Sequence, residues 1–118
     1  MLRLAAWTFC GLLALVLSRP LLGHAILLSA VPQANHTVSG PDVPFTLRFN
    51  ARIDARRSRL TLVAADGTQT PLDVREQTSA DTLTAAAKGL KSGAYVLRWQ
   101  VLAADGHITR GEFPFQVR

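Results

Sequence analysis

The stretch GAYVLRWQVL, residues 93–102, decides the fold. Apolar and aromatic side chains occupy alternate positions along it, and a second, mixed set lies between them. One face carries Tyr95, Leu97, Trp99 and Val101. A repeat of two residues is the pattern of a β-strand, in which successive side chains point to opposite faces. The stretch therefore predicts a strand with Tyr95 and Trp99 in the core.

Shorter strand-like runs occur on both sides of this strand; most alternate in the same way, and residues 25–30 form a short apolar run. They lie at residues 25–30, 45–49, 59–62, 72–75, 83–87 and 113–117. The alanines of 83–87 would also suit a short helical turn, and Pro114, which lacks an N–H group, predicts a sheet edge or a bulge. About seven short strands without a long helix predict one all-β domain, an Ig-like or Greek-key β-sandwich or a small barrel.

The first 23 residues have the pattern of a secretory signal peptide. Met1-Leu2-Arg3 is positively charged, and an almost uncharged apolar run follows from Leu4 to Ser18. A retained membrane anchor is the alternative, but this run of about 15 residues is shorter than the roughly 20 that a spanning helix needs. We therefore expect a signal peptide at 1–23, a mature domain at 24–118 without a membrane anchor, and export to the periplasm.

Two cleavage points remain open. Cleavage after Gly23 would make His24 the first residue of the mature protein. Cleavage after Ala25 would match a small-x-small site more closely, since the preceding residues read Gly23-His24-Ala25. The second choice would discard His24, so the choice decides which ligands the mature protein has.

Composition restricts the classes of site and partner. The only cysteine is Cys10, inside the predicted signal peptide, so the mature domain would contain neither a disulfide nor a thiolate site. The chain has a formal net charge of +5, and four of its arginines fall between Arg52 and Arg59. Without interleaved aromatic residues, this cluster indicates a solvated loop and strand edge rather than a nucleic-acid surface.

Two separated segments carry residues that could bind a metal ion. A mature His24 would offer its α-amine and its imidazole, and Asp105-Gly106-His107 would add a carboxylate and a second imidazole. In extended chain, residues two apart point the same way, so Asp105 and His107 could reach one ion. Three nitrogens and one oxygen suit tetragonal Cu(II). The alternative is a plain Asp-Gly hairpin turn with His107 on the surface, and His36 is expected in a solvated loop.

These residues together resemble CopC-type periplasmic copper-binding proteins. The similarity covers residues 24–118, and it rests on residues 24–27, Pro32, residues 47–49, Leu90, residues 93–95, Trp99, residues 105–107, Gly111, Phe113 and Phe115. The paired N-terminal His and late Asp-Gly-His segment are specific in combination.

The resemblance implies a Greek-key β-barrel that binds Cu(II). The ligands would be the amine and imidazole of His24, with Asp105 and His107. It also implies a membrane copper transporter of the CopD type as partner, and we expect a monomer. The sequence departs from the family twice. Ala51 stands where many members carry an acidic residue, and the only methionine is Met1, so the mature domain would lack a Met-rich Cu(I) loop.

The expected function is copper buffering, delivery or resistance outside the cytoplasm, without enzymatic activity. A small copper-dependent oxidative enzyme is one alternative, although fewer than 100 mature residues leave little room for a flat substrate surface. The other alternative is a metal-free secreted β-sandwich interaction module, which a mature N-terminus at Ile26 would favour.

Overall fold

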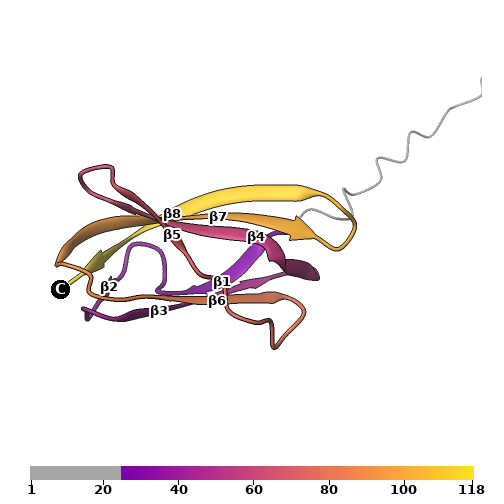
Figure 1. Cartoon of the computed structure of the whole chain (residues 1–118), viewed down its shortest axis with the longest axis horizontal. Helices are drawn as coiled ribbons and strands as arrows, with labels where there is room; N and C mark the ends of the chain where they lie inside the picture. The colour runs from indigo at the N-terminus through magenta and orange to yellow at the C-terminus, as the bar shows by residue number, and fades with distance from the viewer. Residues whose placement is uncertain (1–24) are drawn as a thin grey trace, which may run out of the picture.

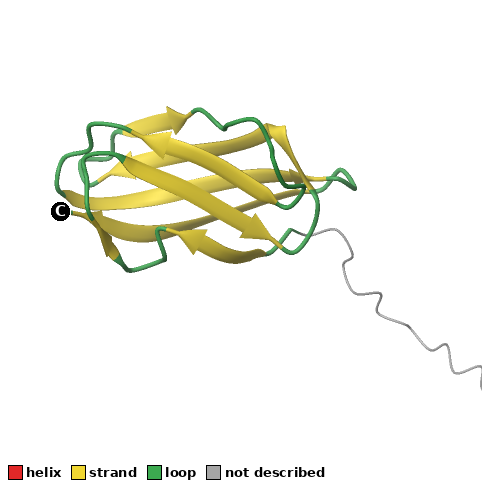
Figure 2. Ribbon diagram, turned by 90° about the horizontal axis from the view of Figure 1, so that it is seen from below, coloured by secondary structure: helices red, strands yellow, loops and turns green. Residues whose placement is uncertain are grey.

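Eight β-strands form two sheets that pack face to face in residues 25–118, the part of the chain that the computed structural model describes (Figure 1). The strands are β1 (Leu27–Val31), β2 (Thr37–Val38), β3 (Val43–Phe49), β4 (Ile53–Ala64), β5 (Gln69–Leu72), β6 (Thr82–Ala87), β7 (Gly93–Ala103) and β8 (Ile108–Val117). One sheet has the order β1-β3-β6 and the other β2-β8-β7-β4-β5. Neighbours are antiparallel except β2 and β8, and loops join the strands at both ends of the sandwich (Figure 2).

The all-β sandwich predicted from the alternation is confirmed. The barrel alternative, which the family resemblance also implied, is wrong because the strands pair in two separate sheets. The additional strand is β2, which lies in the polar stretch after His36 and pairs with β8 through two residues only. A two-residue strand is too short for an alternating pattern to reveal it. The strand predicted at residues 72–75 is shifted, since β5 spans Gln69–Leu72 and only Leu72 belongs to both.

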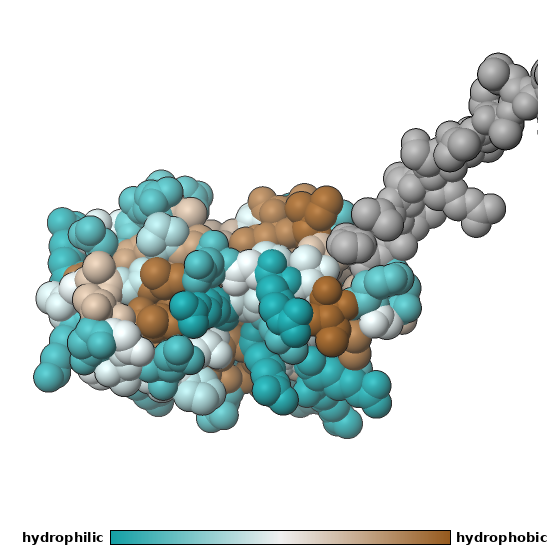
Figure 3. Space-filling model, turned by 90° about the horizontal axis from the view of Figure 1, so that it is seen from above, coloured by the Kyte–Doolittle hydropathy of each residue, from teal (hydrophilic) through white to brown (hydrophobic). Residues whose placement is uncertain are grey.

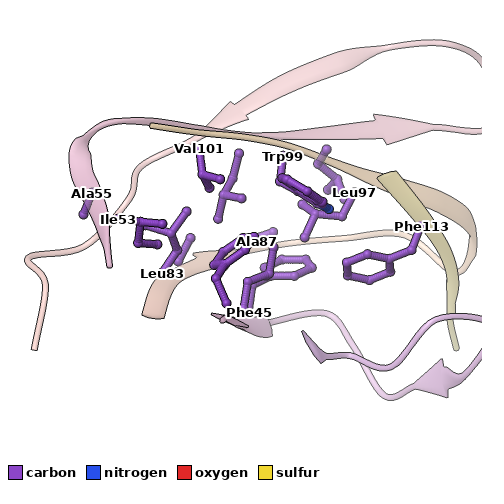
Figure 4. Close-up of a cluster of buried hydrophobic side chains, with 14 of the residues drawn as sticks. Phe45, Ile53, Ala55, Leu83, Ala87, Leu97, Trp99, Val101 and Phe113 are labelled. Atoms are coloured by element: carbon purple, nitrogen blue, oxygen red, sulfur yellow. The ribbon is translucent and has the colours of Figure 1, made fainter. Parts of the chain in front are cut away.

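The core lies between the two sheets. From β7, the side chains of Leu97, Trp99 and Val101 point toward Phe45 and Leu83 on the opposite sheet (Figure 4). All five are buried. The buried alternate positions of β7 follow the period-two pattern of the sequence, so Trp99 is a core residue as predicted. Apolar burial of this kind is the main force that holds the two sheets together.

Tyr95 contributes to the core from its edge. Its ring stacks on Phe115 with a centroid distance of 5.8 Å, and its hydroxyl donates a hydrogen bond to the carbonyl of Lys91 at 2.7 Å. The phenol thus keeps a polar partner while its ring packs against apolar neighbours. Tyr95 therefore packs against the core as a partly buried residue, rather than inside it as predicted.

Strand β4 is longer than the sequence pattern predicted, because a bulge interrupts its alternation. Asp54 pairs with Leu102 and Arg59 with Gln100, so four residues of β4 lie opposite one of β7. The buried Ser58 occupies this bulge. Its hydroxyl donates to the carbonyl of Asp54 at 2.6 Å and accepts from the N–H of Leu102 at 3.2 Å. Ser58 therefore provides hydrogen-bond partners for two backbone groups at the bulge, one on each strand.

Pro114 lies where β8 has an open side, as predicted. Its carbonyl accepts a hydrogen bond from the N–H of Asn35 at 2.7 Å, so the backbone of Pro114 faces away from β7. Strand β2 pairs with β8 only at residues 116–117. The missing N–H of Pro114 thus leaves the β7–β8 ladder intact.

Residues 25–118 contain no helix that is long and apolar enough to cross a membrane. The predicted signal peptide at 1–23 and the candidate ligand His24 lie outside the described residues, so both remain predictions.

Candidate metal centre

A tight turn between β7 and β8 presents two of the predicted ligands. The N–H of Gly106 donates to the carbonyl of Ala103 at 2.9 Å, and the N–H of Ala103 donates to the carbonyl of His107 at 2.8 Å. Gly106 has a φ of 92°, a left-handed conformation that glycine adopts without steric cost. The sequence thus closes the hairpin at Gly106 and places Asp105 and His107 on either side of it.

The turn brings the side chains of Asp105 and His107 together. Oδ2 of Asp105 lies 3.0 Å from Nδ1 of His107, and Oδ1 of Asp105 accepts a hydrogen bond from the backbone N–H of His107 at 3.1 Å. These contacts lower the pKa of the Asp105 carboxyl below its ordinary value. The backbone N–H of His107 has the largest effect, and the His107 side chain has the next largest. Asp105 is therefore an ionised carboxylate, the form that binds a metal ion.

The reason predicted for this proximity was wrong, although the proximity itself is confirmed. Asp105 and His107 belong to the turn and not to extended chain, so strand alternation does not align them. The aspartate reaches forward to the backbone two residues on, as Asp commonly does in turns. The hairpin turn predicted for the segment is confirmed, and it brings the two candidate ligands together.

The spacing of the pair is suitable for one metal ion. Two ligand atoms that are each about 2.0–2.1 Å from a metal lie about 2.8–3.4 Å apart at right-angled to tetrahedral geometry. The separation of 3.0 Å between Oδ2 and Nδ1 falls in this range. The His107 side chain is 60% exposed and that of Asp105 36%, so an ion can approach from solvent.

The described chain begins at the same end of the sandwich as this turn (Figure 1). The N–H of Ile26 donates to Oδ1 of Asn50 at 2.7 Å, and the N–H of Asn50 donates to the carbonyl of Ile26 at 3.0 Å. Two residues farther on, the carbonyl of Arg52 accepts from the N–H of Ala104 at 3.0 Å. The segment 50–52 therefore connects the start of the described chain to the turn that carries Asp105.

Asn50 holds the backbone of Ile26 through a contact that the sequence did not indicate. An Asn directly after an alternating strand is a turn signal, but nothing local indicates a partner 24 positions earlier. Ala51, half-buried beside it, supplies no carboxylate. Within residues 25–118, no third His, Cys, Asp or Glu gathers with Asp105 and His107. A complete metal centre would need donors from outside this range, as the prediction for His24 requires.

His36 lies far from the pair. Its carbonyl accepts a hydrogen bond from the N–H of Gln116 at 2.9 Å, near the end of β8, whereas His107 precedes the first residue of that strand. Eight residues of strand span on the order of 27 Å. The side chain of His36 is exposed, so the interpretation of its segment as a solvated loop away from the site is confirmed.

Comparison with known proteins gives concordant results. The CopC domain model matches residues 27–118. Protein YobA of Escherichia coli K12 is 31% identical over 98 residues, which cover 80% of this chain and 79% of YobA. The crystal structure of CopC from Methylosinus trichosporium OB3b superposes with a TM-score of 0.75 at 29% identity, covering 80% of this chain and 93% of that one. PcoC, a methionine-rich copper resistance protein from Escherichia coli, shares the fold with a TM-score of 0.70 at 24% identity, covering 80% of this chain and 99% of PcoC.

Proposed function

Because the chain belongs to the CopC family, we propose that it binds Cu(II) outside the cytoplasm and serves in copper buffering, delivery or resistance. The ligands are the amine and imidazole of His24, the carboxylate of Asp105 and the imidazole of His107. The observation that carries the proposal is the Asp105–His107 pair, held at 3.0 Å at the end of the sandwich where the described chain begins. Three nitrogens and one oxygen match the preference of tetragonal Cu(II).

The proposal includes removal of residues 1–23 as a signal peptide, with cleavage after Gly23 and a periplasmic location. Only a free α-amine can act as a ligand, and its ordinary pKa of about 7.7–8.0 allows it to lose a proton near neutral pH. Residues 50–52 support this arrangement, since their hydrogen bonds to Ile26 and Ala104 connect the two parts of the site.

The donor set favours Cu(II) over Cu(I). Cu(I) prefers soft thiolate and thioether ligands, and the only sulfur-containing residues, Met1 and Cys10, precede His24. PcoC is methionine-rich by its description, whereas this chain has one methionine. We therefore expect oxidised copper to be the form that this protein carries.

Copper is the cargo in this proposal, and the protein catalyses no reaction on it. The exposure of His107 supports transfer to a second protein, because a recipient's ligands can approach it from solvent. The recipient is a membrane copper transporter of the CopD type, and the carrier is a monomer.

The decisive experiment combines the mass of the exported protein with a copper titration. We expect a chain that starts at His24 and binds one Cu(II), with much weaker binding of Cu(I) in competition with chelators. A matched control is the same chain acetylated at the α-amine of His24, which keeps every side chain and leaves the amine nitrogen unable to bind copper. A mature start at Ile26, or equal Cu(II) affinity in the control, would overturn the ligand set and favour a metal-free interaction module.

A further inference from the structure

The outer face of the five-stranded sheet carries a group of three arginines that the proposed copper site does not use. They come from three adjacent strands: Arg59 from β4, Arg98 from β7 and Arg110 from β8. All three are exposed and line a shallow groove of about 480 Å³. Figure 3 shows a hydrophilic band across this face, with apolar patches on both sides of it.

The strand register fixes how the three arginines are arranged. Gln100 pairs with Arg59 on one side and with Arg110 on the other, so these two arginines are two strands, or about 9.6 Å, apart. Arg98 is two residues along β7 from Gln100, which places it about 8 Å from each of them. The three positions therefore form a triangle with sides of about 8 to 9.6 Å. Alternate side chains of an extended peptide are roughly 7 Å apart, so two successive carboxylates on one face of such a peptide can each reach a neighbouring arginine.

Positive charge in this group exceeds negative charge. Nε of Arg98 donates to Oε2 of Glu112 at 3.0 Å, and Nε of Arg110 donates to Oε1 of Gln100 at 2.9 Å. Arg59 makes no ion pair with any residue of 25–118. A guanidinium has five N–H donors, so the Nε contacts orient two of the arginines without exhausting their capacity to bind anions.

We propose that this arginine groove binds an extended acidic segment of a partner protein, with side-chain carboxylates on Arg59, Arg98 and Arg110. The planar guanidinium matches a carboxylate with two parallel hydrogen bonds. The groove is concave, and the small side chain of Thr61 lies in it beside Arg98, so a chain can lie there.

The position of the groove connects it to the candidate metal centre. Arg110 follows His107 by three residues, so a segment held there places its protein beside the turn. The inference does not depend on copper binding, because none of the three arginines is a proposed ligand.

The test uses a fluorescent nine-residue peptide with Glu at alternate positions, and the same peptide with Gln, added to the purified protein with and without Cu(II). One exposed ion pair changes affinity by a factor of about 1.5 to 5. We therefore expect Arg59→Gln combined with Arg110→Gln to weaken binding of the Glu peptide about tenfold, and the Gln peptide to bind negligibly.

The matched control combines Arg48→Gln on the opposite sheet with Arg75→Gln after β5, which removes the same charge from exposed positions elsewhere. It should change affinity less than twofold. Equal weakening in the control, or equal binding of both peptides, would overturn the proposal. Binding of phosphatidylglycerol vesicles through Arg59 and Arg110, without peptide binding, would overturn it in favour of a lipid surface. If the original protein binds the Glu peptide but fails to bind Cu(II), that result would count against the copper site alone.

Discussion

Replacing Gly111 by alanine should destabilise the protein through a clash with Trp99. Gly111 pairs with Trp99 across β7 and β8, and a Cβ added to it would lie 2.5 Å from Cε2 and 2.9 Å from Nε1 of the indole. Carbon atoms in contact normally stay about 3.5–4.0 Å apart. The ring is 9% exposed and meets Phe49 edge-on at a centroid distance of 5.2 Å, so it cannot move without disturbing the core.

The magnitude follows from three contributions. Overpacking a well-packed core costs about 1–3 kcal/mol, and loss of the Phe49–Trp99 geometry costs about 0.5–1.5 kcal/mol. A strand glycine replaced by alanine otherwise gains about 0.5–1 kcal/mol from reduced freedom of the unfolded chain. We expect Gly111→Ala to lower the free energy of unfolding by about 1–3 kcal/mol, which corresponds to a fall in Tm of roughly 5–20 °C for a domain of this size.

Urea denaturation followed by far-UV circular dichroism measures this loss, and a double-mutant cycle with Trp99→Leu isolates its cause. Leucine removes the indole that Cβ would meet, so Gly111→Ala should cost almost nothing in that background, giving a coupling energy of about 1–3 kcal/mol. The reasoning is refuted if Gly111→Ala leaves stability within about 0.5 kcal/mol of the original protein. It is also refuted if the loss is the same in the Trp99→Leu background.

The remaining predictions concern copper. His107→Ala should lower Cu(II) affinity more than Asp105→Ala, because water replaces a carboxylate oxygen more easily than an imidazole nitrogen; chelator competition and EPR check this, and an equal loss in the distant His36→Ala would contradict it. Affinity should fall between pH 8 and 5, because copper competes with protons for the nitrogens. The lowered pKa of Asp105 keeps its carboxylate ionised through this range, so its protonation begins only at lower pH. Asp105→Asn should therefore bind Cu(II) more weakly, while the slope of affinity against pH should stay unchanged; a flatter slope would contradict this. Asn50→Ala should weaken Cu(II) binding several-fold without changing the ligands, because Ile26 loses its side-chain acceptor; in calorimetry, an unchanged affinity would rule out this positioning role.

Most of the fold could be predicted from the sequence, because alternation between buried and exposed positions is a local property of a strand. The pattern at residues 45–49 and 93–102 needed no knowledge of the partner strands. The pattern failed at β2, which is too short to alternate, and within β4, where the bulge at Ser58 places consecutive arginines outside the ladder. Nothing local distinguishes such a bulge from the end of a strand.

The candidate site divides in the same way. Asp-Gly predicts a turn from the residues themselves, and the short spacing of Asp105 and His107 made their proximity predictable, although the turn and not the strand accounts for it. The hydrogen bonds of Asn50 to Ile26 were not predictable. They join segments that no local pattern connects.

The sequence by itself determined most of the strands, the turn at Asp105-Gly106 and the residue types that stand beside that turn, because each of these depends on neighbours within a few positions. Only the tertiary structure decided that two open sheets form instead of a barrel, and that the described chain begins beside the turn of Asp105 and His107. It also decided that Arg59, Arg98 and Arg110, far apart in the chain, share one groove. These outcomes depend on strand order and register, which are set by packing and hydrogen bonds between distant segments.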